Sequence, residues 1–148
     1  MQIFITEEFV SEVKSISKDK SHSECETDLI NSIFKKSIDE IKNVGTKRLG
    51  GQADKSPFLR KRIGSETSGK SGGYRLYFWL FIIDKNIFLL FIHPKTGRRS
   101  ASNISTEKQK DLVKTFKKCR DENLFYEVEL DKKKTHIIYT KTKKKVLK

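Results

Sequence analysis

Two nearly continuous apolar segments, separated by a short turn, constrain the fold of this chain more than any other feature. Residues 74–83 read YRLYFWLFII, residues 87–93 read IFLLFIH, and Asp84-Lys85-Asn86 between them is typical of a tight turn. Aromatic and β-branched residues favour strands, and two such runs joined by a turn predict an antiparallel hairpin. Because both strands are apolar on both faces, we expect this hairpin at the centre of a sheet, covered by helices.

The first residues of the chain predict a strand followed by a helix. Residues 2–5, QIFI, suit a short strand. Thr6 is expected to cap a helix that begins with Glu7 and Glu8, where the helix dipole favours negative charge. The apolar face of this helix is expected to consist of Phe9, Val10, Val13 and Ile16.

A second, longer helix is predicted next. Ser23 and Glu26 have the spacing of a capping box, and the helix is expected to end before Gly45. Its apolar stripe consists of Leu29, Ile30, Ile33, Phe34, Ile38 and Ile41. Residues 45–57 are then expected to form a loop, and residues 58–63, FLRKRI, a short strand with charged residues among apolar ones.

The residues after the hairpin predict a third helix and a second hairpin. Ser105 is expected to cap the helix, and residues 124–130 and 135–140 are expected to pair as strands on either side of DKKK. We therefore expect an α+β fold in which a small antiparallel sheet is packed by an N-terminal helical pair and a C-terminal helix, with an extra C-terminal hairpin. Residues 1–140 are expected to form one domain, and residues 141–148 a basic, frayed tail. The third helix is expected to bury Leu112, Val113, Phe116 and Cys119.

The charge balance predicts an anionic partner. The 148 residues include 32 Lys and Arg against 19 Asp and Glu, a formal net charge of +13. Such an excess attracts nucleic acid, a membrane surface or an acidic protein.

The longest apolar run is far shorter than the roughly 20 residues that cross a bilayer, and residues 1–10 lack the basic start of a signal peptide. Cys25 and Cys119 have neither zinc nor disulfide spacing, which fits a reducing compartment. We expect a cytoplasmic protein with no metal, no other cofactor and no membrane partner.

Residues 64–71, GSETSGKS, match the pattern of a phosphate-binding P-loop. A P-loop depends on a helix that starts at the end of the motif and directs its N-terminus at phosphate. Here Gly72 and Gly73 follow, and then strand-like sequence, so no helix is expected at Ser71. The match is therefore interpreted as accidental, without a nucleoside triphosphate site.

The same region resembles a family of bacterial toxins. The resemblance rests on FLRKRI before a glycine-rich loop, GKSGGYRLYF entering the hairpin, IFLLFIHPKTGRRSASN, and the helix that begins STEKQKDLVKTF. Together these segments are similar to the RelE/ParE superfamily, and within it to the RelE and HigB branch. The resemblance implies the toxin of a type II toxin–antitoxin system, a ribosome-dependent mRNA endonuclease that inhibits translation. Its implied partners are mRNA in the ribosomal A site, ribosomal RNA and a cognate antitoxin.

The candidate site lies where the hairpin gathers basic residues. Antiparallel pairing brings the start of one hairpin strand next to the end of the other, so one edge of the sheet is expected to concentrate positive charge. Cleavage of RNA without a metal requires a base for the 2′-hydroxyl, stabilisation of the phosphorane and an acid for the leaving oxygen. The catalytic candidates are Arg75, Arg98, Arg99, His93 and Lys70, and the RNA-binding candidates are Arg60, Lys61, Arg62 and Lys95.

The resemblance and the chemistry suggest roles for some of these residues. Arg75 matches the arginine after Gly-Tyr in the family motif and is expected to hold the scissile phosphate, while Arg98 or Arg99 stabilises the transition state. Nearby cations are expected to lower the pKa of His93 and to favour a neutral base. Many relatives carry an aromatic residue at that place, so a packing role for His93 is the alternative.

Four questions stay open from the sequence. RelE uses a tyrosine shortly after its basic loop, whereas residues 95–118 contain none, so Tyr74, Tyr77, Tyr126 and Tyr139 are the possible substitutes. Tyr77 and Trp79 share a strand face with Arg75 and either stack on bases or belong to the core.

The function itself has two alternatives: a ParE-type inhibitor of DNA gyrase, or a nonenzymatic nucleic-acid-binding module with the same fold. The extra hairpin could extend the sheet, contact ribosomal RNA or shape the antitoxin interface.

Overall fold

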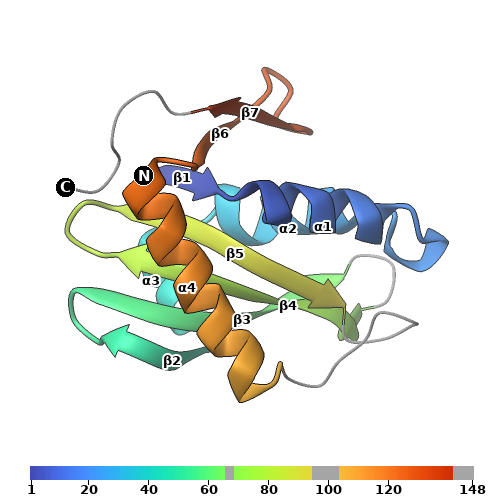
Figure 1. Ribbon diagram of the computed structural model, residues 1–148. Coiled ribbons are helices and arrows are strands. Elements are labelled where there is room, and N and C mark those ends of the chain that lie inside the picture. The colour runs from blue at the N-terminus through green and yellow to red at the C-terminus, as the bar shows by residue number, and fades with distance from the viewer. Residues whose placement is uncertain (66–68, 95–103, 142–148) are drawn as a thin grey trace.

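The computed structural model describes residues 1–65, 69–94 and 104–141 (Figure 1). Within these residues the strands are β1 (Gln2–Ile5), β2 (Thr46–Gln52), β3 (Ser56–Ser65), β4 (Gly69–Phe81), β5 (Asn86–Pro94), β6 (Tyr126–Leu130) and β7 (Ile137–Lys141). The α-helices are α1 (Glu7–Ser17), α2 (Cys25–Leu29), α3 (Ile38–Asn43) and α4 (Thr106–Glu122). A 3₁₀ turn, η1 (Lys20–His22), and a π-helical turn, η2 (Ile30–Phe34), lie between them.

The described strands form one seven-stranded sheet in the order β2-β3-β4-β5-β1-β6-β7. Strand β1 pairs with β5 in parallel, and all other neighbours are antiparallel. The expected hairpin, β4–β5, lies at the centre, and Lys85 makes its tight turn with φ 56°. The α+β class is therefore confirmed, but the sheet is larger than the small antiparallel sheet expected. The C-terminal hairpin β6–β7 extends the sheet beyond β1.

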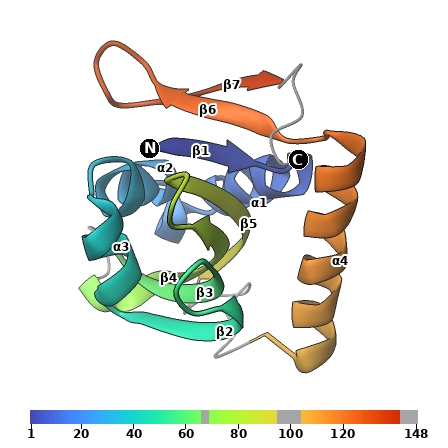
Figure 2. The same cartoon turned by 90° about the vertical axis from the view of Figure 1, so that its left-hand side faces the viewer.

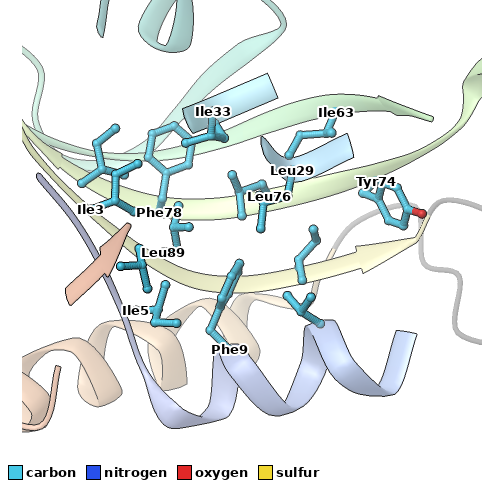
Figure 3. Close-up of a cluster of buried hydrophobic side chains, with 14 of the residues drawn as sticks. Ile3, Ile5, Phe9, Leu29, Ile33, Ile63, Tyr74, Leu76, Phe78 and Leu89 are labelled. Carbon is cyan, nitrogen blue, oxygen red and sulfur yellow. The ribbon is translucent and has the colours of Figure 1, made fainter. Parts of the chain in front are cut away.

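Helices cover both faces of the sheet, so its two core clusters lie on opposite sides. Helices α1, α2 and α3 cover one face, and α4 covers the other (Figure 2). Figure 3 shows the cluster under α1 and α2, where Phe9 and Leu29 pack onto Leu76 and Phe78 of β4. Under α4 the cluster is mostly aromatic: Phe116 stacks on Trp79 at 4.8 Å between ring centroids and meets Phe88 edge-on at 5.3 Å.

Two of the predicted helix caps are present. The Thr6 hydroxyl accepts a hydrogen bond from the backbone N–H of Phe9 at 3.1 Å, and the Ser105 hydroxyl accepts one from Lys108 at 3.1 Å. Each cap satisfies a backbone donor that has no partner within the first turn of its helix. Helix α4 ends at Asn123, which has a left-handed conformation.

The prediction of one long second helix was wrong, because the chain forms α2, the π turn η2 and then α3. On an uninterrupted helix of 3.6 residues per turn, Leu29 and Ile38 would lie on roughly opposite sides. The interruption lets both residues contribute to the core under α1, α2 and α3. Ser37 begins α3 by accepting a hydrogen bond from the backbone N–H of Glu40, whereas the expected capping box at Ser23 does not form because α2 starts after Glu24.

The expected loop at residues 45–57 contains an edge strand instead. Strand β2 pairs antiparallel with β3, with a bulge between Arg48 and Gly50. Gly51 has φ 71°, and a Cβ atom there would lie 2.3 Å from the carbonyl oxygen of Ser56, so the tight β2–β3 turn requires glycine. Edge strands need no alternating apolar face, and charged residues on them oppose aggregation. For this reason the sequence pattern did not indicate a strand.

The described residues of the P-loop pattern lie in strands, where a glycine-rich loop was expected. Gly69, Lys70 and Ser71 belong to β4, and no helix begins at Ser71. A Cβ atom on Gly73 would lie 1.9 Å from the carbonyl oxygen of Ile63, so glycine permits the close approach of β3 and β4. Gly73 therefore serves strand pairing here.

Among the described residues, none of the helices combines the length and apolar character needed to cross a membrane.

Candidate nucleic-acid interface

Strand register brings four basic residues together on one face of the sheet. Arg62 of β3 lies opposite Arg75 of β4, and Arg60 lies opposite Tyr77. Lys47 of β2 lies opposite Arg60. Paired residues and residues two apart on a strand share a face. We call Lys47, Arg60, Arg62 and Arg75 the basic cluster.

The basic cluster lies on the α4 side of the sheet, at the end where β5 finishes (Figure 1). Tyr77, which shares its face, belongs to the core cluster under α4. His93 of β5 lies opposite Arg75, and Phe91 lies opposite Tyr77. Four adjacent strands therefore contribute basic and aromatic residues to the same face of the sheet.

The cations of the basic cluster raise one another's electrostatic energy. Arg75 is half-buried, and its pKa is lowered first by burial and then by the neighbouring charges of Arg60 and Arg62. A guanidinium keeps its proton at any physiological pH, so the lowered pKa reports repulsion and not loss of charge. An anion placed among these side chains would be strongly attracted, which is the property of a phosphate-binding surface.

Beside the cluster, Tyr77 and His93 form a buried hydrogen-bonded pair. The Tyr77 hydroxyl and His93 Nε2 are 3.1 Å apart, and His93 Nδ1 is 3.2 Å from the carbonyl oxygen of Pro94. A carbonyl can only accept, so Nδ1 carries the imidazole proton and Nε2 accepts from the tyrosine. Burial raises the pKa of the Tyr77 hydroxyl, and a hydrogen bond with the backbone of Ile104 partly offsets this rise. These hydrogen bonds form a single chain with one consistent direction.

This geometry corrects the expectation that His93 is a general base. Its pKa is lowered as expected, but burial is the largest cause, and Arg75 and Arg60 add to it. The side chain is only 5% exposed, and both ring nitrogens are engaged. His93 can take a proton from an RNA hydroxyl only by breaking one of these bonds. The observed arrangement therefore matches the alternative, a packing role.

Lys61 was expected beside Arg60 and Arg62, but it lies on the opposite face. Alternation along β3 places Lys61 on the side of the core under α1, α2 and α3. Its ammonium group donates to the carbonyl oxygens of Val44 and Glu40 at the end of α3, and burial lowers its pKa. Lys61 therefore stabilises the end of a helix and does not belong to the basic cluster.

The remaining predicted residues cannot be placed. Lys95, Arg98 and Arg99 lie outside the described residues, and so does the side chain of Lys70, whose backbone belongs to β4. Of the nine candidates, the structure brings together Arg60, Arg62, Arg75 and His93.

The tyrosines and the tryptophan belong to the interior. Trp79 donates from Nε1 to the carbonyl oxygen of Ser56 at 2.8 Å and stacks between Phe58 and Phe116, so the core interpretation is confirmed for it. Tyr77 is fully buried. The other three tyrosines, all described, pack with the core on the opposite face, under α1, α2 and α3: Tyr74, Tyr126 and Tyr139.

Two residues of the interface were missed in the sequence. Lys47 lay in the segment expected to be a loop, and only its assignment to a strand reveals that it adjoins Arg60. Lys108 of α4 lies with its ammonium nitrogen 4.5 Å from the centre of the Phe91 ring and 3.3 Å from a carboxylate oxygen of Glu8. The alternation of side chains along residues 58–63 did indicate one feature of the interface. It places Lys61 on the other face of the strand from Arg60 and Arg62.

The cluster is suited to binding phosphates and to stabilising negative charge in a transition state. Within the described ranges, no group of three or more His, Cys, Asp or Glu side chains is arranged to hold a metal ion. Arginine and lysine hydrogen-bond well to phosphate, and arginine does so through two parallel N–H groups. Comparisons of the chain with family models, curated proteins and solved structures gave no match.

Proposed function

We propose that this chain is the toxin of a type II toxin–antitoxin system and acts as a ribosome-dependent mRNA endonuclease that inhibits translation. In this proposal it belongs to the RelE and HigB branch of the RelE/ParE superfamily and has the RelE-like arrangement of strands and helices. The observation that supports it best is the basic cluster, where Arg62 and Arg75 lie directly opposite each other on adjacent strands. The sequence resemblance around residues 69–78 supports it independently.

The described residues supply phosphate binding and charge stabilisation. Arg75, at the centre of the cluster, would hold the scissile phosphate and stabilise the phosphorane, and Arg60, Arg62 and Lys47 would hold flanking phosphates. Arginines do not transfer protons because their pKa lies far above neutrality. Proton transfer would then involve Lys70 or groups of the ribosome, while Arg98 or Arg99 would add to the stabilisation of negative charge.

Two further partners follow from the same charge. Ribosomal RNA would be attracted to the net positive charge of the chain, which is +13. A cognate antitoxin would neutralise the toxin by placing an acidic segment over the basic cluster. Neither interaction requires a cofactor.

A second candidate function is a nonenzymatic RNA-binding module. The observation that favours it is the state of His93, whose two ring nitrogens are both engaged. Such a module would bind RNA through the basic cluster with similar affinity and would leave it intact.

Primer extension on mRNA in a reconstituted translation system tests the proposal. Wild-type protein should produce cuts that require ribosomes, and Arg75→Ala should abolish them while the variant remains folded. Arg48→Ala is the matched control. Arg48 is an exposed arginine on the adjacent edge strand β2. It lies opposite Leu59, on the face of the sheet that α1, α2 and α3 cover. Intact mRNA with bound protein would favour the nonenzymatic module. Inhibition of DNA supercoiling by gyrase, with intact mRNA, would favour the gyrase inhibitor.

A further inference from the structure

We propose that a pocket between α3 and β3 is a binding site for a small organic carboxylate with an apolar body. We call it the lysine pocket, and its lining includes Ser32, Glu40, Val44, Gly45, Lys61 and Ile63. It lies on the face of the sheet that α1, α2 and α3 cover, whereas the basic cluster lies on the α4 side. The proposal therefore does not depend on the proposed function.

The lysine pocket has the size and the walls of a small-molecule site. Its volume is about 390 Å³, within the range of roughly 300–1,000 Å³ that is usual for such sites. The backbone N–H of Arg62 donates to the carbonyl oxygen of Gly45 at 3.0 Å, which joins β3 to the connection after α3. The side chains of Val44 and Ile63 supply apolar surface. A ligand with an apolar body would therefore fit better than a bare inorganic anion.

The buried charge of Lys61 sets the sign of the ligand. The Lys61 side chain is only 5% exposed, and burial lowers the pKa of its ammonium group. None of the ion pairs found among the described residues includes Lys61. Lysines are rarely buried to this degree without an anion beside them, because an unpaired charge is costly away from water. A carboxylate bound in the pocket would supply the missing partner.

The hydrogen bonds of Lys61 leave one donor for a ligand. An ammonium group has three N–H donors. In the described part of the chain, Lys61 donates to two acceptors, the carbonyl oxygens of Val44 and Glu40. These two bonds fix the position of the ammonium group, and the third N–H can donate to a carboxylate in a short, charge-assisted hydrogen bond.

The carboxylate of Glu40 is engaged elsewhere. It lies 3.7 Å from the ammonium nitrogen of Lys36 and accepts a hydrogen bond from the Ser37 hydroxyl at 3.2 Å. Lys36 and Glu40 are both about half exposed, so this pair lies at the rim of the pocket. The two have opposite effects on the pKa of Lys61, Glu40 raising it and Lys36 lowering it. Since the charges of the pair oppose each other, Lys61 dominates the field inside the pocket.

The test is a titration with hydrocinnamate, followed by NMR of the backbone amides. This probe carries one carboxylate on a phenylethyl body. The amide signals of Gly45, Ile63 and Gly64 should shift together, with a Kd of about 1 mM for a ligand of this size. Hydrocinnamyl alcohol has the same body without the charge, and it should bind at least about tenfold more weakly.

Three variants locate the site and its charge. Lys61→Met keeps an aliphatic side chain and removes the ammonium group, so affinity for hydrocinnamate should fall at least about tenfold. Ser32→Phe fills the pocket, leaves Lys61 in place and should abolish binding. Lys42→Met is the matched control, because Lys42 belongs to α3 but does not line the pocket, and its affinity should stay close to wild type.

Every outcome supports or overturns the proposal. Absence of binding to the wild-type protein would overturn it, and so would shifts confined to Arg60 and Arg75, which would place the probe on the basic cluster. Equal affinity for the acid and the alcohol, or unchanged binding in Lys61→Met, would refute recognition of the carboxylate. Should Lys61→Met not fold, the comparison of acid with alcohol and the Ser32→Phe variant decide by the same criteria.

Discussion

Replacing Arg75 with alanine should remove one phosphate contact from RNA binding, and the loss can be read from the salt dependence. For single-stranded nucleic acid, each neutralised phosphate contributes about 0.7 to the slope of log affinity against log salt concentration. If all four cations of the basic cluster each contact one phosphate, they contribute a slope of about 2.8. The Arg75→Ala variant should therefore lose about 0.7 of the slope.

The affinity should fall as well, by an amount set by the strength of the contact. A hydrogen bond to a charged group contributes about 1.5–3 kcal/mol, which corresponds to a loss of roughly 10- to 150-fold at low salt. Burial and the charges of Arg60 and Arg62 disfavour the Arg75 cation, so its removal relieves repulsion in the folded protein. The melting temperature of the variant should accordingly stay close to the wild-type value.

Fluorescence anisotropy with a short labelled RNA, at several KCl concentrations, measures both quantities. Arg48→Ala removes the same charge from the opposite face of the sheet, where Arg48 donates to the carbonyl oxygen of Gly51. Its affinity and slope should remain near wild type. Equal losses in both variants would show that the net charge, and not the basic cluster, binds RNA, and an unchanged slope in Arg75→Ala would refute the assignment directly.

Three further predictions concern the stability and reactivity of the fold. Phe116→Ala should lower the free energy of unfolding by about 3–5 kcal/mol in urea titrations, since Phe116 is 3% exposed among aromatic rings; a loss below about 1 kcal/mol would contradict that packing. The Cys25 thiol, whose pKa burial raises to about 12, should react with Ellman's reagent only after unfolding, and rapid reaction of the native protein would contradict its burial. Because the pKa of His93 is lowered by folding, the unfolded chain binds the proton first as the pH falls below about 6.5, so stability should decrease with acidification. Urea titrations at several pH values should show this decrease weakened in His93→Gln, and an identical pH profile in both proteins would exclude His93 as its cause.

The parts of the fold that the sequence predicted depend on local patterns. The central hairpin follows from two apolar runs and a turn, and the caps at Thr6 and Ser105 follow from single side chains at the starts of two helices. The interruption before α3 was missed, although Leu29 and Ile38 would lie on roughly opposite sides of one regular helix and so indicate it. Strand β2 was missed since its glycines and charges satisfy an exposed edge, and the parallel pairing of β1 with β5 depends on residues more than 80 positions apart.

The candidate site was predictable in composition but not in arrangement. That basic residues gather near the hairpin follows from antiparallel pairing, whereas the alignment of Arg62 with Arg75 depends on the register of two strands and on a bulge beyond Ile63. The exclusion of Lys61 could have been derived, because alternation in FLRKRI places it with Leu59 and Ile63. The engagement of His93 could not, since its partner Tyr77 is 16 positions away on another strand.

The energetic cost of the basic cluster is itself an argument for its function. Like charges placed directly opposite on paired strands destabilise a sheet, yet Arg62 and Arg75 occupy such a pair, and Arg60 lies two residues away on β3. The strands tolerate this repulsion because their backbone pairing continues into the aromatic core under α4, where Trp79, Phe88 and Phe116 stack. An apolar or neutral residue at position 75 would relieve the repulsion between these side chains. An anion held between these arginines would also relieve it; in the proposed function phosphate groups of RNA supply that charge, so binding would recover stability that the free protein lacks.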